Sequence, residues 1–204
     1  LIEGDNRILV RVNHKAPNTR WYSGAGIYRN VWLRKTSRNH IVQDGIYINA
    51  RPNDSDHREQ GKWKVIIQTE LSMQTCGTLA FDVTDPTGCE AYSCERRVCG
   101  KSDKLVFYID GPKLWDIITP DLYSLSVALY AEDGTQYDSV QTKFGFRTTK
   151  FDPKEGFLLN GIRVKLNGVC MHHDLGALGA AVNYDATYRQ LSKMKEMGVN
   201  AIRP

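Results

Sequence analysis

The sequence lacks the features that would direct the chain to a membrane or to nucleic acid. Its 204 residues contain no apolar run that approaches the roughly 20 residues of a membrane-spanning helix. The 27 Lys and Arg residues only slightly exceed the 23 Asp and Glu residues and form no cluster, which argues against a nucleic-acid interface. The length is also below the about 250 residues of a complete (β/α)8 barrel. What remains is the composition of a folded protein, with 25% charged and 41% hydrophobic residues.

Several common site motifs are absent as well. The run Gly24-Ala25-Gly26 lacks the later Gly of a phosphate-binding loop, and no Gly-x-Ser-x-Gly nucleophile elbow occurs. No two cysteines have two residues between them, as in a Cys-x2-Cys pair, and no His lies near the closely spaced cysteines of residues 89–99. We therefore predict no metal site.

The cysteines leave the cellular compartment open. There are five of them, so at least one is unpaired within the chain: Cys76, Cys89, Cys94, Cys99 and Cys170. The favoured interpretation is a set of strand and loop thiols in a reducing compartment, and a local disulfide is the alternative. A cytoplasmic location and a periplasmic or secreted one both fit this usage.

Most of the sequence alternates apolar and polar residues with the period of two that is typical of β-strands. Turn sequences such as Asp133-Gly134 separate the alternating runs. Six or seven short strands fit between residues 37 and 148, with runs at 46–48, 63–69, 79–83, 105–109, 123–129 and 140–146. This pattern predicts a mainly β fold with an antiparallel, immunoglobulin-like β-sandwich. We expect Trp32, Trp63 and Trp115 in the hydrophobic core.

The first 36 residues stand apart from this sandwich. Residues 8–12 and 27–33 predict two strands, separated by a loop that carries Trp21 and Tyr22, for which core packing and sugar stacking are both open. Two strands cannot form a stable core alone, so they need further strands or must dock on the sandwich. Because the chain also starts at Leu1 rather than Met and stops inside a predicted strand, we expect a piece of a longer protein.

The character of the sequence changes near residue 150. The pair Asn160-Gly161 predicts a β-hairpin with a two-residue turn. A strand up to Cys170, a helix capped by Asp185 and a strand over 199–202 then predict a βαβ unit with parallel strands. The helix carries apolar residues three apart, on one face: Tyr188, Leu191, Met194 and Met197.

The most suggestive cluster for chemistry is His172-His173-Asp174. It follows the strand that ends at Cys170, and ligand groups of α/β folds lie at the carboxyl ends of parallel strands. Imidazole can bond a hydroxyl or transfer a proton, and Arg203 at the end of the next strand can hold a carboxylate through two hydrogen bonds. The alternative is a structural role for the histidines and a surface role for Arg203.

Three segments, in this order, resemble glycoside hydrolase family 2. Residues 20–33, RWYSGAGIYRNVWL, resemble the end of that family's sugar-binding jelly-roll domain. Residues 156–174, GFLLNGIRVKLNGVCMHHD, are similar to the entry into its catalytic barrel, and residues 194–203, MKEMGVNAIR, to its first barrel helix and second strand. Within the family the segments look most like β-galactosidases.

The resemblance implies three parts of a larger enzyme. Residues 1–36 would be the last strands of the jelly-roll domain, residues 37–148 the immunoglobulin-like sandwich, and residues 149–204 the start of an incomplete TIM barrel. The whole enzyme would hydrolyse terminal β-linked sugars with retention, using two carboxylates about 5 Å apart. In the family the acid/base Glu follows an Asn, and this sequence has no Asn-Glu pair and only the first two barrel strands. These residues alone should therefore be inactive.

The resemblance also implies roles for the cluster. His172 matches a position that contacts the sugar, Arg203 matches the arginine that orients the nucleophile, and His173 and Asp174 are more variable substrate-binding neighbours. No cofactor is implied for these residues, although some members use a divalent cation, and the partners would be a β-linked sugar and further copies in a homo-oligomer. Where some β-galactosidases carry an acidic residue, this sequence has residues 18–20, Asn-Thr-Arg. The alternative function is a non-enzymatic β-sandwich module that binds carbohydrate or protein.

Overall fold

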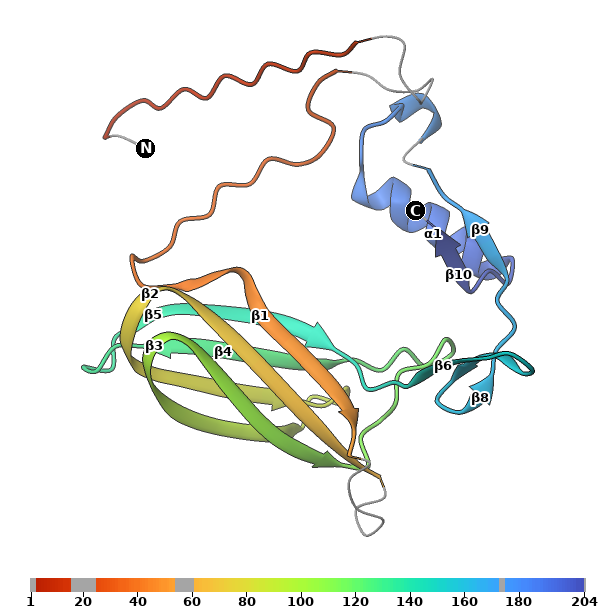
Figure 1. Cartoon of the computed structure of the whole chain (residues 1–204). Helices are drawn as coiled ribbons and strands as arrows, with labels where there is room; N and C mark the ends of the chain where they lie inside the picture. Colours follow the sequence, from red (N-terminus) through yellow and green to blue (C-terminus); the bar gives the residue numbers. More distant parts are fainter. Residues whose placement is uncertain (1–2, 16–24, 54–60, 173–174, 204) are drawn as a thin grey trace. The chain divides into compact units, whose positions relative to one another are not determined.

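The chain folds into two compact units. The computed structural model describes residues 3–15, 25–53, 61–172 and 175–203. One unit is Arg34–Lys165, and the other combines Leu1–Leu33 with Leu166–Pro204 (Figure 1). None of the helices in the described ranges has the length and apolar character needed to cross a membrane.

Five antiparallel strands build the larger unit. They are β1 (Ile41–Pro52), β2 (Lys62–Thr84), β3 (Glu90–Asp110), β4 (Tyr123–Tyr130) and β5 (Gln136–Phe144). The sheet has the order β1-β2-β4-β5, and β3 pairs with β2 outside this path. β2 therefore pairs with β3 along both of its halves, and on its other edge first with β1 and then with β4.

Two of these strands are longer than the sequence pattern predicted. β2 has 23 residues and joins the runs over 63–69 and 79–83 that were expected as separate strands. β3 has 21 residues and includes the Gly- and Cys-rich stretch. Their pairing register shifts between Glu70 and Thr75, and the curled hairpin is visible in Figure 1. The sheet thus supplies two layers, β1–β2–β3 and β3–β2–β4–β5, which confirms the predicted mainly β, sandwich-like fold.

The hydrophobic core lies between these two layers. Alternate residues of β4 are buried, as the period of two predicts: Tyr123, Leu125, Val127 and Leu129. They pack with buried residues of β2 and with Phe146, whose ring makes edge contacts to Trp63 at 5.4 Å and to Tyr123 at 4.8 Å between centroids. Burial of each large apolar side chain contributes about 1.5–3 kcal/mol, so this core is the main source of stability in the unit.

Two expectations about the aromatic residues and the first strands are wrong. Trp63 is buried and Trp115 is partly buried beneath the Arg147 guanidinium, but Trp32 is 84% exposed. The described parts of residues 3–33 contain no strand, and Ile8 and Leu9 are exposed. The physical reason is that an extended segment becomes a strand only when another strand satisfies its backbone groups. Trp21 and Tyr22 lie outside the described residues.

A small three-stranded sheet follows β5 in the same unit. It consists of β6 (Thr149–Asp152), β7 (Gly156–Leu159) and β8 (Ile162–Arg163), all antiparallel. Asn160 and Gly161 have φ of 51° and 77°, which confirms the predicted two-residue turn. The Asn160 side chain accepts a hydrogen bond from the Thr148 N–H at 2.9 Å and donates one to the Trp115 carbonyl at 3.0 Å. This side chain therefore ties the hairpin to two separate loops of the sandwich.

The cysteines differ from the favoured interpretation. Cys76 of β2 and Cys99 of β3 are directly opposite in the register, with a Cα–Cα distance of 4.1 Å, and form a disulfide. Both residues are exposed on the outer face of the sheet. Cys89, Cys94 and Cys170 are free thiols. The sequence could not show this pairing because it depends on the alignment of β2 with β3, which spacing alone does not give.

Replacing Asn160 tests its role as a tie. We expect Asn160→Gly, which keeps the left-handed backbone and removes both side-chain hydrogen bonds, to lower the free energy of unfolding by about 1–2 kcal/mol. Asn160→Ala should cost roughly 1 kcal/mol more, because a Cβ without a polar group disfavours that backbone. Urea denaturation followed by tryptophan fluorescence measures both. A loss no larger than that of Gln136→Ala, an exposed control on β5, would contradict the tie.

The disulfide predicts a specific thiol count. In denaturant without reductant, three of the five cysteines should react with a thiol reagent, and all five after reduction. Because the bond closes a loop with a sequence separation of 23, its removal in Cys76→Ala/Cys99→Ala should cost about 3 kcal/mol of stability. Cys89→Ala serves as the control and should leave the unfolding free energy nearly unchanged. Five reactive thiols in protein matured under oxidising conditions would show that the pair does not form.

Candidate functional site

The predicted site residues lie on the βαβ unit of the smaller compact unit. Its elements are β9 (Gly168–Cys170), the 3-10 helix η2 (Gly176–Leu178), α1 (Tyr184–Glu196) and β10 (Ala201–Arg203). β9 and β10 are parallel, with Ala201 opposite Gly168 and Arg203 opposite Cys170. The prediction of a strand, a helix and a parallel second strand is therefore confirmed.

Helix α1 begins at a different cap from the one the sequence suggested. The Asn183 side chain accepts a hydrogen bond from the Ala186 N–H at 3.1 Å, so Asn183 is the N-cap. Asp185, the predicted cap, lies in the first turn, where its negative carboxylate interacts favourably with the positive end of the helix dipole. The prediction failed because both residue types are good caps and they are only two positions apart. The helix ends at Glu196, and Gly198 just beyond its C-cap has φ of 86°, the left-handed conformation that commonly terminates helices.

His172 and Arg203 come from adjacent strand ends. The Met171 N–H donates a hydrogen bond to the Arg203 carbonyl at 2.9 Å, so His172 follows directly after the last bond between β9 and β10. Both residues are exposed, and Arg203 is the last residue of β10. The parallel pairing thus brings an imidazole and a guanidinium to one edge of the sheet. Together the His172 and Arg203 side chains can bind hydroxyls and orient a carboxylate. His173 and Asp174, the other two predicted site residues, lie outside the described residues.

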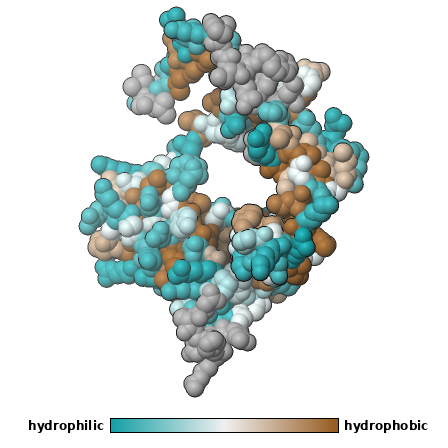
Figure 2. All heavy atoms as spheres, turned by 45° about the vertical axis from the view of Figure 1, so that its right-hand side comes forward, coloured by the Kyte–Doolittle hydropathy of each residue, from teal (hydrophilic) through white to brown (hydrophobic). Residues whose placement is uncertain are grey.

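The apolar face of α1 is largely exposed. Tyr188 is 64%, Leu191 is 38% and Met197 is 78% exposed. Figure 2 shows hydrophobic residues on the surface of the molecule, among hydrophilic ones. In the part of the chain that the structure describes, no group of three His, Cys, Asp or Glu side chains is placed to hold a metal ion.

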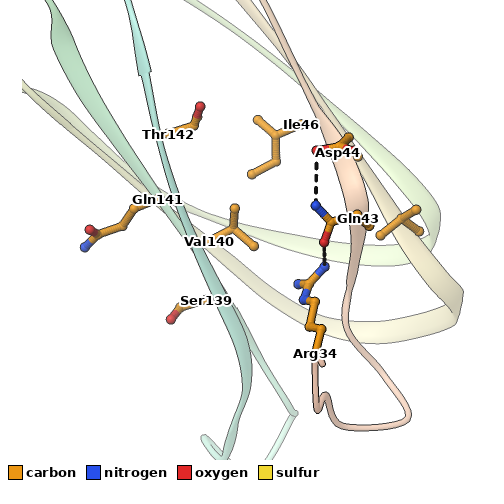
Figure 3. A pocket seen from close by; sticks show the side chains of 10 residues that line it. Arg34, Gln43, Asp44, Ile46, Ser139, Val140, Gln141 and Thr142 are labelled. Carbon is orange, nitrogen blue, oxygen red and sulfur yellow. Dashed lines mark hydrogen bonds between the residues drawn. The ribbon is translucent and has the colours of Figure 1, made fainter. Parts of the chain in front are cut away.

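A second candidate site, which sequence reasoning missed, is a cavity in the larger unit. It has a volume of about 480 Å³ and lies between β1 and β5 (Figure 3). One wall comes from Arg34 and the start of β1, and the other from residues 139–142 of β5. A signal was present, since Asp44-Gly45 is a turn-like pair just before the predicted strand over 46–48. Its meaning depended on the approach of two strands that are distant in sequence.

Comparison with known proteins places the sandwich in a family. Residues 40–147 match the family model described as Glycosyl hydrolases family 2. A β-galactosidase of Bacteroides ovatus, BoGH2A, is 41% identical over 97% of this chain, and a β-glucuronidase of Bacteroides fragilis is 33% identical over 97%. These alignments cover 24% and 30% of the two relatives, so the chain spans about a quarter of their length.

Solved structures show the same likeness. A family 2 glycosyl hydrolase of Bacteroides cellulosilyticus has a TM-score of 0.79 and 30% identity, over 90% of this chain and 26% of that one. A β-glycosidase of Bacteroides vulgatus has a TM-score of 0.78 and 33% identity, over 90% of this chain and 23% of that one. The folds of the matched regions are therefore alike. Of the two relatives compared by sequence, one is named a β-galactosidase and the other a β-glucuronidase.

The helix cap gives a testable prediction for the βαβ unit. We expect Asn183→Ala to destabilise α1 by about 1 kcal/mol, because the Ala186 N–H loses its acceptor. Asp185→Ala should cost only a few tenths of a kcal/mol, about the size of a lost dipole interaction. Hydrogen exchange of the α1 amides measures both variants. A larger effect for Asp185→Ala than for Asn183→Ala would show that Asp185 is the cap.

Proposed function

The chain belongs to glycosyl hydrolases family 2, and from this membership we propose that the whole protein is a retaining β-glycosidase that acts on terminal β-linked sugars. The observation that carries the proposal is the match of the sandwich to the family over residues 40–147. It is supported by the position of His172 and Arg203 at neighbouring carboxyl ends of parallel strands, where sugar-binding and catalytic groups of barrel enzymes lie.

We propose β-galactosides as the first substrate class. The support is the 41% identity to a β-galactosidase, against 33% to a β-glucuronidase. A β-glucuronide is the second candidate, because several of the similar proteins carry that name. The two substrates differ at C4, where the hydroxyl has the opposite configuration, and at C6, where a hydroxymethyl group is replaced by a carboxylate, so a direct comparison of rates separates them.

Each site residue has a role in this proposal. The His172 imidazole would hydrogen-bond a sugar hydroxyl, and the Arg203 guanidinium would orient the nucleophilic carboxylate through two parallel hydrogen bonds. His173 and Asp174 would be further substrate contacts. Retention needs one carboxylic acid and one carboxylate about 5 Å apart, and no Asn-Glu pair stands in these 204 residues. The catalytic pair, and any ligands for a divalent cation, would therefore come from other residues of the whole protein.

Activity assays with two substrates test whether the chain alone is inactive and whether His172 and Arg203 have the proposed roles. The purified chain should hydrolyse neither 4-nitrophenyl β-galactoside nor 4-nitrophenyl β-glucuronide above the rate of its His172→Ala variant. In the whole protein we expect Arg203→Lys to lower kcat roughly 100-fold, because a lysine cannot hold the nucleophile bidentately. His172→Ala should lower kcat/KM about tenfold or more through a lost sugar contact.

The matched control for both variants is Lys193→Ala, on the exposed surface of α1. It should leave kcat and KM of the whole protein unchanged. Turnover by the 204-residue chain alone, or full activity of Arg203→Lys, would contradict the assigned roles.

A further inference from the structure

We propose that the cavity between β1 and β5 is a binding site for a neutral pyranoside, on the sandwich and separate from His172 and Arg203. The site would hold a sugar without transforming it. It goes beyond the proposed hydrolysis, since it needs neither catalytic carboxylate.

The cavity exists because two strand edges face each other without pairing. Among the described residues β1 pairs only with β2 and β5 only with β4, so each has one edge outside the ladder. The two strands meet at one end, where the Asp138 carboxylate accepts a hydrogen bond from the Ile41 N–H at 3.0 Å. Beyond that contact they separate around a space of about 480 Å³, within the roughly 300–1,000 Å³ of known small-molecule sites.

One wall of the cavity is a connected row of polar side chains. Arg34 donates to Asp138 at 3.3 Å and to the Gln43 side-chain oxygen at 2.9 Å. The Gln43 side-chain nitrogen in turn donates to the Asp44 carboxylate at 3.2 Å (Figure 3). Each member fixes the orientation of the next, so the wall is organised before any ligand binds. A carboxylate has more acceptor positions than this one bond uses, and they remain for ligand hydroxyls.

The backbone that presents Asp44 is strained. Val42 to Gly45, four residues of β1, stand opposite the single residue Glu70 of β2, because the register passes from Ile41–Leu71 to Ile46–Thr69. Asp44 has φ of 58°, in the left-handed region that costs a non-glycine residue about 1–2 kcal/mol. A Cβ on Gly45 would lie 2.9 Å from the Val42 carbonyl oxygen, so only glycine fits there. Strained backbone of this kind is concentrated at ligand sites.

The floor of the cavity is apolar. Ile46 and Val140 lie between the two strands in Figure 3. Ser139 and Gln141 lie on the other side of β5 in the same view, so that strand contributes the Val140 side chain and its backbone edge. A pyranose ring has this same division, with C–H groups on its faces and hydroxyls on its rim. The aliphatic floor can contact the C–H face while Asp44 and Gln43 bond the rim hydroxyls.

The charges select a neutral ligand. The charge of Arg34 is matched by Asp138 in an ion pair, which leaves the Asp44 carboxylate as the net charge of the wall. An anionic sugar would be repelled by it. An extended peptide is disfavoured for another reason, because the irregular backbone over residues 42–45 interrupts the ladder that an added strand would need. Since no aromatic ring is among the lining residues, we expect weak affinity.

A chemical-shift titration of the isotope-labelled chain tests this proposal. The probes are methyl β-D-galactopyranoside and methyl β-D-galacturonide, which differ only in the carboxylate at C6. We expect saturable shifts for the galactoside at the amides of residues 42–46 and 139–142, and at least about tenfold weaker binding of the galacturonide. Asp44→Asn, which keeps a residue tolerant of the left-handed backbone, should weaken galactoside binding roughly tenfold or more.

Three further variants make the outcome decisive. Val140→Phe fills the cavity without altering the polar wall and should also abolish the shifts. Glu95→Gln, at an exposed acid on β3, and His172→Ala should leave them unchanged. The absence of saturable shifts, equal binding by Asp44→Asn, or equal binding of both sugars would overturn the proposal. Shifts that centre on residues 172 and 203 and vanish in His172→Ala would overturn it as well, while supporting the proposed hydrolase site.

Discussion

The pairing of β2 with β3 is the interaction on which the sandwich depends. It runs from Lys62–Asp110 to Thr84–Glu90 and passes from one layer to the other through the register shift after Glu70. β1 and β4 each pair with the other edge of β2, and β5 pairs with β4. The positions of β1, β4 and β5 in the sheet therefore depend on this hairpin. The Cys76–Cys99 disulfide joins the same two strands just beyond the shift. A covalent bond at this point holds together the two strands that connect the layers.

Local sequence predicted what local physics decides. The alternation in β4, the Asn160-Gly161 turn and the parallel strands around α1 all follow from residue periodicity and turn chemistry, and all were confirmed. Apart from the cap of α1, which was a choice between two neighbouring residues, the failures share one cause, which is dependence on distant partners. Residues 8–12 have the composition of a strand, but composition cannot supply the neighbouring backbone that a strand needs. The junction that makes β2 one strand is likewise fixed by its pairing with β3 on both sides of the register shift, not by its own sequence.

The two candidate sites differ in the same respect. The placement of residues 172 and 203 at neighbouring strand ends could be predicted, because a βαβ unit pairs its two parallel strands and roughly 30 residues contain the whole geometry. The cavity could not be predicted, because its walls are about 100 positions apart in the chain and meet only when the sheet curls. The contact that sets their separation, between Asp138 and the Ile41 N–H, is a single long-range hydrogen bond.

Two left-handed residues in the described chain, Asn160 and Asp44, show how backbone strain can be interpreted. At Asn160 two hydrogen bonds of the side chain, one from the Thr148 N–H and one to the Trp115 carbonyl, offset the strain. Within the part of the chain that the structure describes, Asp44 has no comparable bond to distant backbone, and its contact is with the adjacent Gln43 at the wall of the cavity. An alternative role for the irregular backbone is to protect an edge strand from pairing with other chains. That role needs the irregular backbone but not a carboxylate, so Asp44→Asn would preserve it. The same substitution would weaken a sugar site, because that site needs the carboxylate. The chemistry of the side chain, rather than the shape of the strand, therefore separates the two explanations.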